Sequence, residues 1–528
     1  MILRSFALLL VVHLAACTPA PPWDLSDPSH PYADVLRRQP VEPWLNPQPP
    51  ETGATSLLPE TGPLHLTIEL AALVALEGNR DLRVQRLTPQ IVATFEDIER
   101  AVYDPELFLG ASILKDEGTE VSRATGESFS TEREDSTLQG GVRTNLPTGT
   151  TIELGASVDR STSNRTTDQQ IARVGLTLTQ ALLRGFGPDV NLAQIRKARL
   201  ETEASLYELR GFTEAVLADA ESTYWRFAQA SRQIEIFEQS FELARLQNQE
   251  VRQRIEIGVL PQTEAATAEA ELAQRSQDLI DARSRRDVLR LQLLRLLNLP
   301  FDEIATREII AATDPSTDPL PIESLDERLQ VADIWRSDLN EARLRLAQRR
   351  LDTIVTRNGL LPRLDLFITL GKTGYADSFS GAWKDIDGPN YDLQAGIDFA
   401  VPLGNRAAEA ANRGAVLSVA QASEAIENLA ELVRLDVLVA AAEVERARQQ
   451  IGASAATRAL REEAVRAESE RFRVGDSTSL LVAQAQRDLL ASRIAEVDAV
   501  IAYRLALIQL HVAEGTLLAR RGLVALDR

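Results

Sequence analysis

The sequence predicts a mainly α-helical protein that also carries strands of a membrane β-barrel, built from two copies of one arrangement. Two very long amphipathic helices are expected, and each ends at a glycine turn that leads into a shorter helix. Ahead of each long helix, apolar and polar residues alternate in runs typical of strands. The interval between the two turn glycines, Gly258 and Gly475, nearly equals the interval between the starts of the long helices, near Ala181 and Pro402. This near-constant offset indicates an internal duplication.

Residues 1–16 are predicted to be a signal peptide. Arg4 supplies a positive charge before an apolar run, residues 6–12, that is too short to span a bilayer. The run Leu14-Ala15-Ala16-Cys17 resembles a bacterial lipobox, in which the cysteine becomes the acylated N-terminus. Cys17 is therefore the predicted lipidation site, and the alternative is an ordinary secretory signal with an incidental cysteine. Because Thr18 rather than an aspartate follows, the outer membrane is the expected destination.

A lipidated, proline-rich segment is expected over residues 17–65. Residues 18–66 contain 12 of the 24 prolines. Proline has no amide donor and interrupts regular helix, so this stretch is predicted to be an extended tether between the lipid and the folded chain.

Helical periodicity defines two repeats, residues 66–300 and residues 322–518. Each begins with a short helix, continues into a long helix that ends at its turn glycine, and closes with a helix of intermediate length. Apolar residues recur every three or four positions in the long helices, as in coiled coils. Residues 301–321 form a connector, and residues 519–528 form a tail. The expected helices are 66–103, 188–258, 262–298, 324–361, 402–475 and 477–514.

Between the short and the long helix of each repeat the periodicity changes from 3.6 to 2. One face of each run is apolar and the other polar or acidic, over lengths that suit strands crossing a membrane barrel. The alternative is a soluble sheet packed on a core. The runs lie near residues 107–113, 138–146, 150–160, 176–182, 364–370 and 393–401.

Composition and missing motifs argue against several classes of protein. Acidic residues exceed basic ones by 77 to 57, for a formal charge of −20, so nucleic acid is not an expected partner. One cysteine and four histidines leave little for a metal site, and neither metal nor cofactor is expected. Gly371-Lys372-Thr373 resembles the end of a phosphate-binding loop, but Leu366 stands where the loop needs its first glycine. His511 lies among leucines and is expected to be a packing residue. No catalytic residue is predicted, and the chain is not expected to be an enzyme.

Two duplicated motifs carry a family resemblance. Residues 178–187 and 399–406 stand before the long helices, and residues 254–258 and 471–475 stand at their ends. In this order they resemble the strand-to-helix and turn motifs of the outer-membrane efflux (TolC-like) protein family. The resemblance covers about residues 66–518. With its lipobox, the chain is similar to the lipoprotein members of the family, the outer-membrane factors of RND-type efflux systems.

The resemblance implies a homotrimer, lipid-anchored in the outer membrane of a Gram-negative bacterium, with its helices in the periplasm. Each protomer would give strands to one shared barrel, surrounded by outer-membrane lipid, and helices to one periplasmic tunnel. The trimer would be the channel of a tripartite efflux or type I secretion system. It would passively conduct substrates from a periplasmic adaptor protein and an inner-membrane transporter to the exterior. The alternative is a non-conducting periplasmic coiled-coil scaffold lipoprotein.

The resemblance also implies a gate and an adaptor-docking surface at the two turns, Gly258 and Gly475. Family members often carry acidic residues just after the turn glycine. Here Glu264 lies six residues after Gly258, but Leu481 lies six after Gly475. An acidic ring would therefore use Glu264 with Asp476, and such rings favour cations. The alternative is that both acids only complement helix N-termini.

The number of strands departs from the family pattern, which has two strands per repeat. The first repeat has a surplus hairpin around residues 138–160. We expect either that this hairpin extends beyond the outer surface, or that the membrane-spanning strands are not those that the periodicity assigns.

Overall fold

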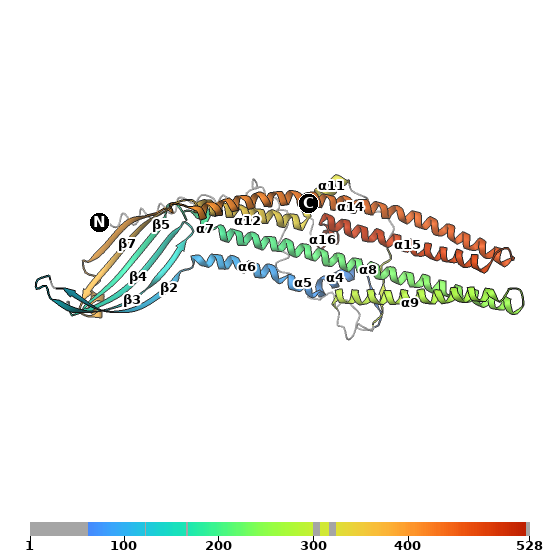
Figure 1. Cartoon of the computed structure of the whole chain (residues 1–528), viewed down its shortest axis with the longest axis horizontal. Coiled ribbons are helices and arrows are strands. Elements are labelled where there is room, and N and C mark those ends of the chain that lie inside the picture. Colours follow the sequence, from blue (N-terminus) through green and yellow to red (C-terminus); the bar gives the residue numbers. More distant parts are fainter. Residues whose placement is uncertain (1–61, 122, 165–166, 299–306, 316–323, 524–528) are drawn as a thin grey trace. The chain divides into compact units, whose positions relative to one another are not determined.

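The computed structural model describes residues 62–121, 123–164, 167–298, 307–315 and 324–523 (Figure 1). The predicted signal peptide and Cys17 lie outside these residues, as does nearly all of the proline-rich segment. The chain forms two compact units. The sheet unit comprises residues 90–204 and 343–425, and the helical unit comprises the described parts of residues 31–89, 205–342 and 426–528.

The sheet unit contains one six-stranded sheet in which all neighbouring strands are antiparallel. Its order, β2-β3-β4-β5-β7-β8, follows the chain, and the step from β5 to β7 joins the two repeats. A short helix, α13 (Phe379–Asp385), lies between β7 and β8 in the sequence. The strands are β2 (Glu106–Val121), β3 (Ser128–Leu146), β4 (Thr150–Ser163), β5 (Gln169–Ala181), β7 (Arg363–Ala376) and β8 (Tyr391–Ala400).

Strand alternation places apolar side chains on one face of this sheet. Leu107 at one edge and Leu393 at the other are 72% and 63% exposed. Large contiguous apolar surfaces are rare on soluble monomers, so this face calls for an apolar partner. Through the register, one row across all six strands joins Leu107, Val142, Leu154, Leu176, Leu370 and Leu393.

The surplus hairpin predicted around residues 138–160 is part of the sheet. It forms β3 and β4, which lie between β2 and β5 and pair on both sides. The tip of the β2–β3 ribbon extends furthest, because β3 pairs with β4 only as far as Arg133 but with β2 as far as Ser128. The expectation that residues 138–160 project from the sheet is therefore wrong.

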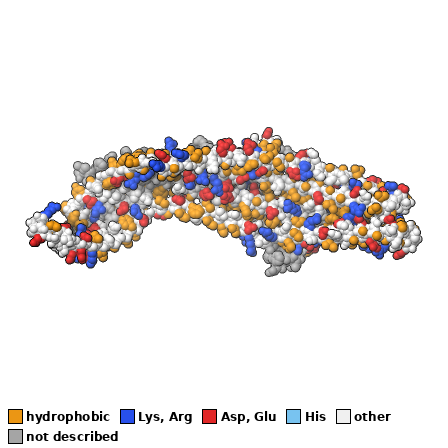
Figure 2. Space-filling view, in the orientation of Figure 1, with side chains coloured by type: hydrophobic (Ala, Val, Ile, Leu, Met, Phe, Trp, Pro, Cys, Tyr) orange, Lys and Arg blue, Asp and Glu red, His pale blue; other side chains and the backbone are white. Residues whose placement is uncertain are grey.

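The helical unit contains two long hairpins (Figure 1). The first consists of α8 (Ala193–Glu256) and α9 (Thr263–Leu297), and the second of α14 (Arg406–Arg473) and α15 (Ser479–Glu514). Both α8 and α14 begin in the sheet unit. The mainly helical prediction is confirmed, and the long helices end at the predicted turns. Acidic, basic and apolar side chains are interspersed along the surface of the helices (Figure 2).

The two short helices of the repeats are not continuous, contrary to expectation. Asn79 has an extended backbone, and its side-chain oxygen accepts a hydrogen bond from the Leu82 amide at 2.9 Å, so a new helix begins there. Arg336 breaks the second helix in the same way, with a ψ of 119°. Periodicity misses both breaks because a one-residue interruption leaves the apolar stripe almost in phase. The resulting elements are α4 (Ile68–Gly78), α5 (Arg80–Gln85), α6 (Leu87–Arg100), the 3-10 turn η2 (Ala101–Tyr103), α11 (Leu325–Trp335) and α12 (Ser337–Gly359).

The main core of the helical unit lies where α8, α9 and α15 meet α4 and a small parallel sheet. This sheet, β1 (Leu64–Leu66) with β6 (Ile309–Ala311), was not predicted, because such short strands leave no periodic signal. The fully buried Tyr224 of α8 donates a hydrogen bond to the Leu66 carbonyl at 3.0 Å and accepts one from the Thr313 amide at 3.0 Å. Fully burying a large apolar side chain stabilises a fold by about 1.5–3 kcal/mol. The other fully buried residues here are Leu217, Phe227, Leu293 and Leu297.

A second core joins α14 to α15. Val433, Val437 and Val444 of α14 are buried against Tyr503 and Leu510 of α15. The chain then continues into α16 (Leu517–Arg520), so the start of the expected tail is helical. None of the helices in the described ranges is both long and apolar enough to cross a membrane.

Candidate functional site

Each long hairpin turns at a glycine with a left-handed backbone. Gly258 has φ +75° and Gly475 has φ +84°. At the second turn the Gly475 amide donates to the Phe472 carbonyl at 3.1 Å, and the Asp476 amide donates to the Arg471 carbonyl at 2.8 Å. The first turn repeats these two bonds, so both helices end in a Schellman motif. No heavy atom lies within 4 Å of a Cβ built on either glycine, so the backbone angle and not space requires glycine.

Glu264 lies in the first turn of α9 and faces the second hairpin. Its carboxylate accepts a hydrogen bond from the hydroxyl of Ser479, the first residue of α15. A carboxylate in a first helical turn also complements the helix dipole. The structure therefore places Glu264 both in the N-terminal turn and between the hairpins.

Asp476 lies just outside α15 and is more exposed than Glu264. Its side chain is 75% exposed, and its nearest cationic partner is Arg471 at 3.4 Å. The cap of α15 is Thr478, whose hydroxyl accepts a hydrogen bond from the Leu481 amide. The predicted alternative, in which Asp476 complements this helix end, is therefore not supported by a capping hydrogen bond.

Three contacts link the two hairpins close to their turns, and we call them the interhairpin contacts. They are the Glu264–Ser479 hydrogen bond, an ion pair between Glu271 of α9 and Arg487 of α15 at 3.2 Å, and the Arg254 guanidinium 5.1 Å from the Phe472 ring. Further from the turns, the Asp498 carboxylate accepts hydrogen bonds from Gln229 at 2.7 Å and Gln233 at 2.8 Å. The sequence pointed to Arg254 and Phe472 only as members of the turn motifs. It gave no signal for Ser479, Glu271 or Arg487, because their pairing depends on how the hairpins pack.

The turns also expose large apolar side chains, which we call the tip residues. All are more than half exposed, although they lie beside charged positions. Exposed apolar clusters rimmed by polar residues mark protein interaction surfaces. The tip residues are Ile257 and Val259 of the first hairpin and Val474 and Leu480 of the second.

The face of the sheet opposite the apolar row is polar and contains a row of glycines. Gly141, Gly155, Gly175 and Gly371 pair in register across β3, β4, β5 and β7. The Phe108 ring, on β2, would be 2.8 Å from a Cβ at Gly141. At the other end of the row the Arg173 guanidinium donates to the Asp392 carboxylate at 2.7 Å, and these side chains lie over Gly175 and Gly371. The glycines therefore let neighbouring side chains lie flat on this face.

The strand-to-helix motif of the first repeat binds the turn between β3 and β4. The Asn191 amide group donates to the carbonyls of Pro147 at 3.0 Å and of Gly185 at 2.8 Å. The Gly187 amide donates to the Thr148 carbonyl at 3.1 Å. Gly149 has φ +84°, and a Cβ there would be 2.2 Å from the Gly185 carbonyl oxygen. The turn is thus built into the motif that the family resemblance rests on.

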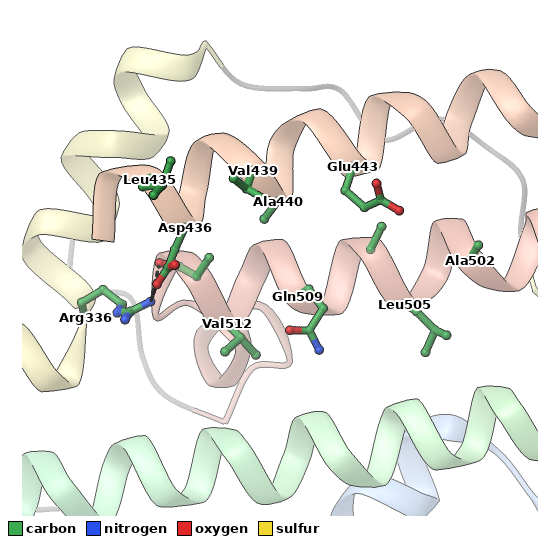
Figure 3. A pocket seen from close by; sticks show the side chains of 12 residues that line it. Arg336, Leu435, Asp436, Val439, Ala440, Glu443, Ala502, Leu505, Gln509 and Val512 are labelled. Atoms are coloured by element: carbon green, nitrogen blue, oxygen red, sulfur yellow. Dashed lines mark hydrogen bonds and ion pairs between the residues drawn. The ribbon is translucent and has the colours of Figure 1, made fainter. Parts of the chain in front are cut away.

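A groove of about 700 Å³ runs between α14 and α15 (Figure 3). Leu435 and Val439 of α14 and Leu505 and Val512 of α15 give it an apolar lining. At one end the Arg336 guanidinium forms an ion pair with Asp436 at 3.4 Å. An open, mostly apolar groove between two helices can accept a side-chain ridge of another helix.

Titratable side chains are buried in the core of the helical unit rather than gathered into a reactive site. Burial, together with the charges of Arg520, Arg521 and Arg328, lowers the pKa of His511 to about 3. Burial raises the pKa of Glu214 to about 7. His511 therefore packs as a neutral side chain, as predicted. Within the ranges that the structure describes, no three His, Cys, Asp or Glu side chains form a group that could hold a metal ion.

Comparison with known proteins links these features to one family. A sequence model described as outer membrane efflux protein matches residues 329–516, which confirms the predicted resemblance. No curated protein matches the chain. The chain is similar to three solved channel structures at identities that establish the fold alone. These are the CmeC outer membrane channel of Campylobacter jejuni (16% identity, 87% of each chain covered, TM-score 0.63), the outer membrane protein VceC of Vibrio cholerae (16%, 85% of this chain and 96% of VceC, 0.62) and the open-state MtrE outer membrane channel of Neisseria gonorrhoeae (19%, 85% of this chain and 89% of MtrE, 0.59).

Proposed function

We propose that this chain, which has the fold of outer-membrane efflux channels and matches their family over residues 329–516, is one protomer of such a channel. The observation that carries the proposal is the six-stranded sheet, which is apolar and exposed on one face and polar on the other. In a membrane barrel the apolar face meets lipid and the polar face lines a water-filled lumen. A non-conducting scaffold, the alternative, has no need of such a sheet.

The proposed location is the outer membrane of a Gram-negative bacterium. The strands would lie in outer-membrane lipid, the helices in the periplasm, and acyl chains on Cys17 would anchor the N-terminus. More than one acyl chain is needed for stable anchoring, which the lipobox type of modification supplies.

The proposed assembly is a homotrimer, and an exposed apolar stripe supports it. Four side chains at coiled-coil spacing on α6 and η2 are each about half to three-fifths exposed. Such a stripe is a helix-packing seam without its partner. Neighbouring protomers would cover this stripe and also the groove between α14 and α15. The stripe consists of Ile91, Phe95, Ile98 and Val102.

The channel would act passively, between a periplasmic adaptor protein with its inner-membrane transporter and the exterior, in efflux or type I secretion. The interhairpin contacts would hold the periplasmic end narrow, and Glu264 with Asp476 would place acidic charge there. The tip residues, beside Gly258 and Gly475, would bind the adaptor. Opening would then separate the two hairpins at these contacts, without catalysis by the chain itself.

Planar-bilayer recording of the purified protein tests this proposal. We expect small conductance steps from the unaltered protein and larger ones from the double variant Ser479→Ala, Arg487→Ala, which removes two interhairpin contacts. Arg461→Ala is the matched control, because it removes a surface ion pair with Asp488, at 2.8 Å, within one hairpin. It should conduct like the unaltered protein. Silence from all three proteins would contradict the channel and favour the scaffold.

A further inference from the structure

We infer that the barrel of this channel has 18 strands, six from each of three protomers, and that the β3–β4 hairpin forms part of its membrane wall. This inference rests on the proposed function and deepens it. Two strands per repeat, the family pattern, would give four strands per protomer and a barrel of 12. The hairpin therefore changes the width of the channel rather than decorating its surface.

The hairpin is inserted into the sheet along its full membrane-facing length. β3 pairs with β2 from Arg143 opposite Glu106, and with β4 from Leu146 opposite Thr150. β4 in turn pairs with β5 from Thr150 opposite Gln180 to Ser161 opposite Gln169. With 19 and 14 residues, β3 and β4 exceed the roughly 9–11 residues that a tilted membrane strand needs.

The turn of the hairpin is fixed at the end of the sheet where the helices begin. Asn191 and Gly187 bind the carbonyls of Pro147 and Thr148, and Gly149 approaches Gly185 too closely for any side chain. Thr150, the first residue of β4, is buried. A hairpin that folded away from the barrel would have to break these contacts.

Both faces of the sheet continue through the hairpin without interruption. Val142 and Leu154 are members of the apolar row, and Gly141 and Gly155 are members of the glycine row on the polar face. The apolar face ends at a charged level, where Lys115 of β2 pairs with Glu134 of β3 at 3.1 Å. The hairpin thus has the same lipid-facing and lumen-facing sides as the strands around it.

The edges of the sheet point to closure by copies of the same chain. In the part of the chain that the structure describes, β2 and β8 each have one strand neighbour. An open strand edge in lipid leaves backbone groups without hydrogen bonds, so both edges must be paired. Because six alternating strands make β2 and β8 run in opposite directions, β8 of one protomer can pair with β2 of the next in antiparallel fashion. Such a head-to-tail ring closes with cyclic symmetry.

Eighteen strands would make an unusually wide duct for this fold. With strands about 4.8 Å apart and tilted by about 40°, the backbone diameter is about 36 Å for 18 strands and about 24 Å for 12. Barrels of 16–18 strands leave an aqueous channel. The outer end of this duct would therefore pass a bulkier cargo than a 12-stranded barrel could.

Thiol labelling in outer-membrane vesicles tests the inference. Four single-cysteine variants would be compared, all at one depth in the sheet: Leu154→Cys and Glu153→Cys on β4, and Leu370→Cys and Thr369→Cys on β7. The probe is a water-soluble, membrane-impermeant maleimide, and the unaltered chain, whose one cysteine is Cys17, gives the background. We expect Glu153→Cys and Thr369→Cys to label at least several-fold faster than Leu154→Cys and Leu370→Cys.

The β7 pair separates failure of this inference from failure of the proposed function. If Leu370→Cys is protected but Leu154→Cys labels as fast as Glu153→Cys, the hairpin lies outside the bilayer, and the 18-stranded barrel is wrong while the channel stands. If both leucine positions label fast, the sheet is not in lipid, and both ideas fail. Electron cryomicroscopy of the unaltered protein in nanodiscs does not depend on the variants folding. Eighteen strands around one lumen would support the inference, and 12 would overturn it.

Discussion

At the scale of single residues, the acidic side chains at the turns distinguish a selective gate from a simple helix end. Glu264 is held by Ser479, whereas Asp476 is largely exposed. If three copies of each line the entrance, the double variant Glu264→Gln, Asp476→Asn should lower the preference for cations, because a ring of carboxylates attracts them. The reversal potential in a salt gradient measures this change.

The matched control for this prediction is Glu431→Gln. Glu431 is an exposed acid on α14, paired with Arg434 one helical turn away, and should leave the reversal potential unchanged. An unchanged reversal potential in the double variant as well would sink the acidic ring. The first-turn role of Glu264 at the helix dipole would then be sufficient to explain its position.

His511 makes the folded state sensitive to acid. Its pKa is lowered by burial and by Arg520, Arg521 and Arg328, from 6.5 to about 3. The stabilisation of the neutral form is therefore complete above pH 6.5 and is lost as the pH falls towards 3. His511→Asn should remove this loss, which is on the order of 3 kcal/mol at pH 4.

Thermal unfolding of the helical unit between pH 7 and pH 4 measures the effect. His65→Asn is the control, because His65 is an exposed residue of β1. The variant at His511 should lose less stability on acidification than the unaltered protein, and the variant at His65 should lose as much. Equal acid sensitivity in all three would contradict the assignment to His511.

At the scale of elements, the turn glycines differ from helical glycines in one property only. Gly475 and Gly452 both have open space around a built Cβ, but only Gly475 has a positive φ. Gly452→Ala should stabilise α14 by about 0.5–1 kcal/mol, as alanine does within a helix. Gly475→Ala should destabilise the hairpin by about 1–2 kcal/mol, because the left-handed backbone brings Cβ close to the next carbonyl oxygen. Denaturant unfolding of the two variants should show opposite signs, and equal signs would refute the argument.

The elements also show how far a sequence alone can be interpreted. The long helices and their turns were predicted because Gly258 and Gly475 interrupt very long periodic patterns, which form α8 and α14. The breaks at Asn79 and Arg336 were not, since one extended residue hardly shifts an apolar stripe. Alternation detected the strands of the extra hairpin, but their place in the sheet depends on pairing with β2 and β5. The partners of Glu264 and Glu271 at the gate likewise come from the other repeat, far away in the sequence.

At the scale of the whole molecule, two sets of exposed apolar side chains should have separable roles. The stripe on α6 and η2 is expected to pack against a neighbouring protomer, and the tip residues are expected to bind the adaptor. Burying one such side chain contributes about 1.5–3 kcal/mol. The variant Ile91→Ser, Phe95→Ser, Ile98→Ser should therefore dissociate the trimer in detergent at concentrations where the unaltered protein stays assembled, as light scattering of the detergent-extracted protein would show.

The tip variant Ile257→Ser, Val474→Ser is the matched counterpart, because it removes apolar side chains of similar or greater exposure. It should remain trimeric, since these residues lie at the turns, but should lose affinity for a periplasmic adaptor. Chemical crosslinking of the channel to the adaptor in cells would measure that loss. If the tip variant dissociated and the stripe variant did not, the stripe would not be the protomer interface. The helices of the trimer would then have to meet through other faces, of which the groove between α14 and α15 is the next candidate.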